Sequence, residues 1–226
     1  MPWIDRARWL LLWLGLPLLL VLAWDLSPAD LRVAQWYGTI KGFALEHNYW
    51  LSHIFHTRAR QTGVLLGLAC VLAIWWPVGP LARTTRRERV WLACMVWVCA
   101  AGIALLKSTS HTSCPSELQT FGGVARYVWH FTLGNDGGPG RCFPSGHAST
   151  FFSFLPVFWL LRRYRAQRAW WFLALLVALG LALSWVQVLR GAHYPSHIFW
   201  TAWLCWAASA VASPLMGRAA NEISLG

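Results

Sequence analysis

Six long apolar stretches limit what this chain can fold into more than any other feature of its sequence. A helix that crosses a lipid bilayer needs about 20 mostly apolar residues. The stretches cover residues 9–25, 62–80, 90–106, 148–161, 169–188 and 197–213. Hydrophobic residues make up 57% of the 226 residues and charged residues only 12%, which is too few for a soluble domain of this size. The sequence therefore predicts an all-α fold, a single membrane-embedded domain over residues 1–226 built as a six-transmembrane-helix bundle.

Lysine and arginine residues lie in short clusters between these stretches rather than along one surface. The net charge is +11, but the absence of a single basic stripe argues against a nucleic-acid partner. One set of helix ends carries Arg6, Arg8, Arg83, Arg86, Arg87, Arg89, Arg162, Arg163, Arg165 and Arg168. Because positively charged loops stay on the cytoplasmic side, we expect both termini in the cytoplasm. Three loops then face outward, at about 26–61, 107–147 and 189–196.

The first outward loop mixes bulky apolar residues, such as Trp36 and Trp50, with polar ones. This pattern predicts one or two amphipathic helices that lie on the membrane surface. An ordinary packed loop explains the same composition equally well.

Three polar clusters fall on the predicted outward side, at residues 107–115, 141–149 and 187–197. The second contains Pro144-Ser145-Gly146-His147 directly before an apolar run, which is typical of a tight turn into a helix. Free backbone N–H groups at such a turn favour an anion. His147 adds a group that exchanges a proton near neutral pH. These features predict a phosphate-binding turn.

The other two clusters add basic groups to the same side. Lys107 ends an apolar stretch, where its ammonium group could reach an oxyanion or simply extend to the membrane interface. Arg190 could hold phosphate oxygens in a bidentate manner. His193 could attack phosphorus and form a phospho-histidine. A lone histidine at an interface is more often a packing residue, so the prediction depends on all three clusters converging.

The three clusters resemble the signature of the type 2 phosphatidic acid phosphatase (PAP2) superfamily: Lys-x6-Arg-Pro, then Pro-Ser-Gly-His, then Ser-Arg-x5-His-x3-Asp. The resemblance covers about residues 90–215. It implies a bacterial inner-membrane phosphatase that acts on a membrane lipid phosphate at the periplasmic side and needs no metal or other cofactor. It also implies that His193 is the nucleophile and His147 the general acid. Lys107, Ser145, Gly146 and an arginine would hold the phosphoryl oxygens.

The sequence departs from this signature at three positions, with Cys114 and Gln187 in place of arginines and His197 in place of the aspartate. Arg190 could replace the guanidinium missing at 187, since residues three apart share a helix face. Arg141, directly before the phosphate turn, could supply a second one. We expect His197 to accept a hydrogen bond from His193 and fix its tautomer.

Cys114 and Cys142 would both lie in an oxidising compartment if the predicted orientation holds. We hypothesise that they form a disulfide that ties the first motif to the second. Two free thiols are the alternative.

Other functions stay open from the sequence. His193-x3-His197 has helical metal-ligand spacing, and His47, His53 and His56 lie in another outward loop, so a zinc site is conceivable. A lipid-to-lipid phosphotransferase would use the same phospho-histidine. A non-catalytic membrane protein would explain the altered arginine and aspartate positions.

Overall fold

The computed structural model describes residues 8–9, 11–132 and 134–217, and the side chains of residues 53–56 lie outside this description. The predicted all-α character is confirmed, with eight α-helices, α2 to α9, in the described part of the chain. The elements in chain order are η1 (Leu11–Gly15), α2 (Leu16–Asp25), α3 (Ala29–Tyr37), β1 (Gly38–Thr39), β2 (Gly42–Phe43), η2 (Trp50–Arg58), α4 (Ala59–Leu72), η3 (Gly79–Arg83), α5 (Arg86–Thr109), η4 (Pro115–Glu117), η5 (Gln119–Phe121), α6 (Gly146–Phe152), α7 (Pro156–Tyr164), α8 (Ala166–Leu189), α9 (Pro195–Ala212) and η6 (Ser213–Met216).

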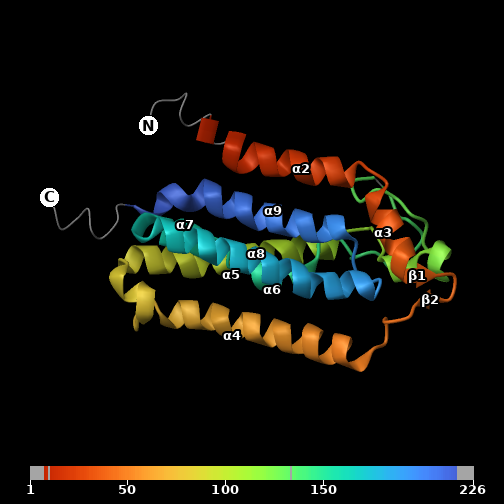
Figure 1. Cartoon of the computed structure of the whole chain (residues 1–226), viewed down its shortest axis with the longest axis horizontal. Coiled ribbons are helices and arrows are strands. Elements are labelled where there is room, and N and C mark those ends of the chain that lie inside the picture. The colour runs from red at the N-terminus through yellow and green to blue at the C-terminus, as the bar shows by residue number, and fades with distance from the viewer. Residues whose placement is uncertain (1–7, 10, 133, 218–226) are drawn as a thin grey trace.

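The long helices run side by side along the molecule (Figure 1). Helices α5, α8 and the α9–η6 unit (Pro195–Met216) are long and apolar enough to cross a membrane. The segment Leu11–Asp25 with Ala29–Tyr37 makes a fourth candidate, although it bends by 59°. The described residues thus contain three or four candidate spans by this test, where the sequence predicts six.

Prolines account for the two helices that are shorter than predicted. The stretch predicted as one helix over 148–161 is divided into α6 and α7, and Pro156 opens α7. Proline has no N–H to continue the preceding helix, so it favours a new helix start. Similarly, α4 has 14 residues and ends at Leu72, before Pro77.

The first predicted outward loop folds over one end of the bundle (Figure 1). It contains the helix α3 and the antiparallel pair β1–β2, whereas its last residues form the π-helical segment η2, which runs directly into α4. Helix α3 buries Asp30, Val33 and Ala34, and it contacts α8 and α9. Part of this loop therefore packs against the bundle, as the packed-loop alternative requires.

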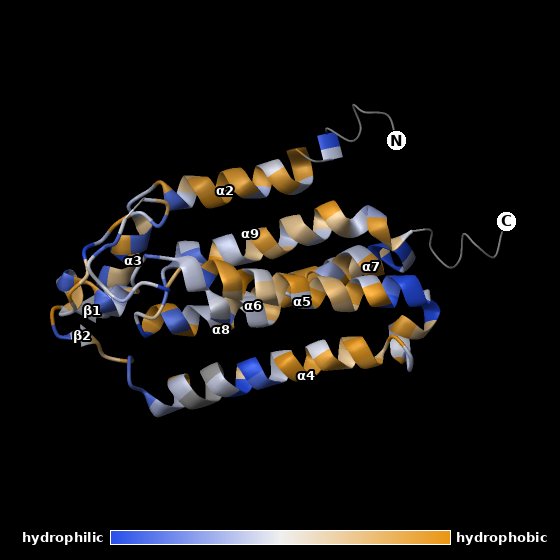
Figure 2. Ribbon diagram, turned by 180° about the vertical axis from the view of Figure 1, so that it is seen from behind, coloured by the Kyte–Doolittle hydropathy of each residue, from blue (hydrophilic) through white to orange (hydrophobic). Residues whose placement is uncertain are grey.

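Apolar side chains cover the outside of the bundle as well as its core. In Figure 2 the middle of most helices is mainly hydrophobic and most polar segments lie at the two ends, although α4 carries a hydrophilic turn along its length. Exposed large apolar residues on three helices include Leu19, Leu20, Leu65, Leu66, Leu68, Leu175 and Leu179. A soluble monomer rarely exposes so much contiguous apolar surface, so these faces are suited to lipid.

One end of the bundle gathers two of the three basic clusters on which the predicted orientation depends, those at 83–89 and 162–168; Arg6 of the first cluster lies outside the described residues. Thr85 and Glu88 form a capping box at the start of α5. The Glu88 carboxylate also accepts from Tyr164 Oη at 2.6 Å and pairs with Arg163 Nη1 at 3.0 Å. Arg87 Nε donates to the Leu215 carbonyl at 3.2 Å, so the end of the described chain lies here too. The three polar motifs occupy the opposite end of α5, α6 and α9.

Candidate active site

The predicted phosphate turn is a sharp entry into α6. Ser145 is the N-cap residue, and its side chain accepts from Ala148 N at 3.3 Å. Two contacts with α9 hold the turn from below: Ser145 N donates to the His197 carbonyl at 3.2 Å, and Thr201 Oγ1 donates to the Ser145 carbonyl at 3.1 Å. The second and third motifs are therefore joined through the backbone.

Lys107, in the last turn of α5, lies over this turn. A Cβ atom built on Gly146 would be 3.4 Å from Lys107 Cδ and 3.8 Å from Lys107 Nζ. These distances are ordinary van der Waals contacts, so the end of the Lys107 side chain packs directly on the turn. The structure brings together the first and second motifs as the sequence predicts.

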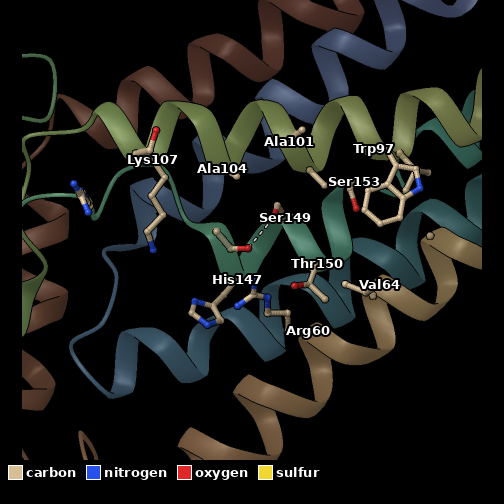
Figure 3. Close-up of a pocket in the computed structure, with 17 residues that line it drawn as sticks. Arg60, Val64, Trp97, Ala101, Ala104, Lys107, His147, Ser149, Thr150 and Ser153 are labelled. Carbon is tan, nitrogen blue, oxygen red and sulfur yellow. Dashed lines mark hydrogen bonds between the residues drawn. The ribbon is translucent and has the colours of Figure 1, made fainter.

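A cavity of about 690 Å³ opens beside Lys107 and His147, between α4, α5 and α6 (Figure 3). One part is basic and polar, and its wall includes Arg60, Lys107, Arg141, His147 and Ser149. The other part is apolar, and its wall includes Val64, Val96, Trp97, Ala100, Ala101 and Ala104. Such a cavity matches a molecule with an anionic head and an apolar tail.

His193 lies next to His147 and is not itself among the residues that line the cavity. The centroids of the two rings are 5.8 Å apart. His193 is 2% exposed, and its Nδ1 atom is 3.6 Å from Cys142 Sγ. This contact engages Nδ1, so an attack by His193 would use the other ring nitrogen, Nε2. The predicted pair of histidines is brought together.

The surroundings of His193 keep its ring neutral. Burial lowers the pKa of the imidazole well below its usual range, and the positive charge of Lys107 lowers the pKa further. A neutral imidazole carries the lone pair that a nucleophile needs.

Cys114 and Cys142 form the hypothesised disulfide, with their Cα atoms 5.2 Å apart. The bond links the segment after α5 to the segment before α6, across 28 positions of sequence. Because Cys142 also contacts His193, one covalent link fixes all three motifs around the same point.

Arg141 lies in the cavity wall, where the sequence predicts a substrate-binding arginine. Its backbone has φ of 60°, a conformation that residues with a side chain rarely adopt. Its N–H donates to the Ser110 carbonyl at 2.8 Å. Strained backbone of this kind clusters at functional sites.

Arg190 does lie on the same face as Gln187, and its Nη1 donates to Gln187 Oε1 at 3.1 Å. However, Nε and Nη2 both donate to the Glu46 carbonyl, at 3.1 and 3.0 Å. The guanidinium therefore holds the first outward loop, and Arg190 is not part of the cavity wall described above.

His197 is fully buried, but the hydrogen bond expected from His193 is not formed. Their ring centroids are 5.7 Å apart, and neither nitrogen of His197 has a hydrogen-bond partner among the described residues. Its ring instead packs edge-on against His130 and Phe143, at 5.5 and 5.2 Å. His130 Nε2 in turn lies 3.2 Å from Asp25 Oδ1.

Asp30 is a supporting residue that the sequence reasoning missed. Its carboxylate accepts from the backbone N–H of Ser196 at 3.0 Å, from Ser196 Oγ and from Trp24 Nε1 at 2.8 Å. It therefore caps the start of α9 from 166 positions away in sequence. A lone aspartate in a mixed loop offers no local pattern that predicts this role.

The zinc alternative depends on His193 and His197 and on His47, His53 and His56 of the first outward loop, and the side chains of His53 and His56 lie outside the described residues. Among the described residues, one group has metal-ligand spacing: Cys114, Cys142 and His193. Both sulfur atoms of that group are bonded to each other, so neither is a free thiolate ligand.

One of three comparisons with known proteins gives a match, and it is to a family. Searches of curated proteins and of solved structures give no significant match. A sequence model described as the PAP2 superfamily matches residues 88–220, which include all three motifs and more than half of the chain. Enzymes of this superfamily are metal-independent phosphatases. The chain therefore belongs to the PAP2 superfamily.

Proposed function

We propose that this protein is a membrane lipid phosphatase that hydrolyses a phosphomonoester or diphosphate through a phospho-histidine on His193. The observation that carries the proposal is the two-part cavity. Its basic part lies beside Lys107 and His147, and its apolar part continues between α4 and α5. A lipid phosphate has this same division between head and tail. Undecaprenyl diphosphate, phosphatidylglycerophosphate, phosphatidate and lipid A phosphates are the candidate substrates.

In the proposed reaction, His193 Nε2 attacks phosphorus while the bond from phosphorus to the leaving oxygen breaks. His147 donates a proton to that oxygen. A water molecule then attacks the phospho-histidine, His147 takes up one of its protons, and inorganic phosphate leaves. Lys107, Arg141 and the Ser145–Gly146 turn stabilise the charge on the phosphoryl oxygens. The disulfide contact on Nδ1 supports the choice of Nε2.

We also propose a membrane arrangement with six spans, in the bacterial inner membrane. These are η1–α2, η2–α4, α5, α6–α7, α8 and α9–η6. The clustering of Arg83–Arg89 and Arg162–Arg168 at one end supports a cytoplasmic location for that end. The motifs at the other end then face the periplasm, where the disulfide is stable.

A lipid panel assay in the presence of a chelator tests the proposed function. Wild-type protein in detergent micelles should release inorganic phosphate from at least one of the four candidate lipids, and His193→Ala should not. Equal phosphate release by His193→Ala would refute the phospho-histidine mechanism. It would favour a non-catalytic protein, with the measured phosphate released by a contaminating phosphatase. Phosphate transfer to a second lipid, with no release from a single lipid, would favour the phosphotransferase.

A further inference from the structure

The site lacks guanidinium groups at the two positions where the family signature has them. Position 114 holds a disulfide-bonded cysteine, and position 187 holds a glutamine. Arg190, the nearest replacement, donates to the Glu46 carbonyl. Within the family-matched region, the side chains of Lys107 and Arg141 are the cations that line the cavity. A phosphoryl group with up to two negative charges would gain from a further cation.

Helix α4, which precedes the family-matched region, brings one further cationic residue, Arg60, to the cavity. Arg60, Gly63, Val64 and Gly67 all line it. Their spacing of three, four and seven places them on one face of the helix. That face of α4 is therefore the cavity face.

Gly63 and Gly67 let α4 approach α5 and α6 closely, which brings Arg60 to the cavity wall. A Cβ atom on Gly63 would lie 2.6 Å from Thr150 Cγ2 and 3.2 Å from the Thr150 carbonyl oxygen of α6. A Cβ atom on Gly67 would lie 3.2 Å from Trp97 Cζ2 of α5. Larger residues would push α4 away from both helices and widen the cavity.

Figure 3 shows the Arg60 side chain extending from α4 toward His147, on the side of the cavity opposite Lys107. Arg60 is exposed, so its guanidinium is accessible. Arg58 lies about 200° away around an α-helix of ideal pitch. It donates from Nη1 to Gln61 Oε1 at 3.3 Å and is not among the cavity residues. The two arginines thus share a sequence neighbourhood but differ in direction.

We propose that Arg60 is a substrate-binding residue that holds the reacting phosphoryl group from the α4 side and supplies the guanidinium missing at position 187. This inference rests on the proposed phosphatase function. A bidentate contact from a guanidinium to two phosphoryl oxygens suits this position. The alternative without a functional role is that the Arg60 side chain only extends to the membrane interface, as arginines near helix ends often do.

The test compares Arg60→Gln with the matched control Arg58→Gln in the purified full chain. Removing a hydrogen bond to a charged group predicts roughly a ten- to hundred-fold fall in kcat/KM for Arg60→Gln. Phosphatidate and a polyprenyl diphosphate should show the fall alike, because the contact is to the reacting phosphoryl group. Inhibition by inorganic phosphate should weaken by a similar factor. Arg58→Gln should stay within about two-fold of wild type on both measures.

Two results would overturn the assignment. One is equal kinetics for Arg60→Gln and Arg58→Gln, which is what an interfacial role predicts. The other is a loss confined to the diphosphate, which would place Arg60 at a second phosphate. If Arg60→Gln does not fold, Arg60→Lys decides: it keeps the charge but not the bidentate contact, so unchanged inhibition by inorganic phosphate would refute the proposal. The His193→Ala variant tests the proposed function separately. If that variant is active, the phospho-histidine mechanism is refuted, independently of the result for Arg60.

Discussion

Removing the Cys114–Cys142 disulfide should both destabilise the protein and disable its active site. The bond closes a loop across 28 positions of sequence. The chain-entropy treatment of a loop of this size gives a stabilisation of roughly 3.5 kcal/mol. A double substitution, Cys114→Ala with Cys142→Ala, should lower the free energy of unfolding by about that amount. The double variant avoids leaving a single reactive thiol.

The effect on activity should exceed what lost stability explains. The disulfide connects the segments that carry Lys107 and the phosphate turn, and Cys142 Sγ contacts His193 Nδ1. Without it, His193 loses the group that packs against one ring nitrogen, and the loop that carries Arg141 is no longer tied to the end of α5. Displacements of about 1 Å at such a site cost on the order of 100-fold in rate.

The assay measures unfolding in detergent by denaturant titration, and kcat on the folded fraction at a temperature well below the transition. Cys94→Ala removes an exposed free cysteine of α5 and serves as the control, which should behave as wild type. Treatment of the wild type with a reductant should reproduce the double variant. The reasoning would be refuted by a double variant whose unfolding free energy and kcat both match those of Cys94→Ala.

Three further outcomes are expected. Asp30→Ala should destabilise the protein by about 3 kcal/mol or more, because it leaves the buried N–H and hydroxyl of Ser196 without their acceptor; an unfolding curve like that of the wild type would contradict the capping role. Stability should fall as the pH drops below 6.5, since the pKa of His193 is lowered on folding and the unfolded chain then binds a proton that the folded chain does not. His193→Asn should make the unfolding free energy less dependent on pH between about pH 7 and pH 5, and an unchanged slope would assign the effect to other groups. Gly63→Leu should lower kcat/KM by about ten-fold or more, because the new side chain meets Thr150 and displaces α4; normal kinetics would show that the position of α4 is not important.

The parts of the fold that depend on local pattern were predictable from the sequence. The length of the apolar stretches predicts α5, α8 and α9 to within a few residues, because each of these stretches forms one continuous helix. Apolar length alone predicts a helix that extends beyond the end of α4, and one helix in place of α6 and α7. The prolines at 77 and 156 interrupt the helices without lowering the hydrophobicity of the stretch. The motif order correctly placed Lys107 and His147 at one cavity.

The parts that depend on distant contacts were not predictable. Arg190 was expected at the phosphate, but the Glu46 carbonyl, which belongs to a loop with no clear pattern, competes for its guanidinium. His197 was expected to hydrogen-bond His193, but His130 and Phe143 pack around its ring instead. A periodicity within one helix carries no information on which loop residue will meet it.

The cap that α3 places on α9 means that the folded unit extends beyond the region of recognisable family sequence. The matched region begins at residue 88, yet Asp30 holds the start of α9, the helix that follows His193. A fragment that begins at residue 88 would keep every signature residue and lose the carboxylate that orders the third motif. Any change that moves Asp30 away from Ser196 would then disturb the third motif without altering a single signature residue.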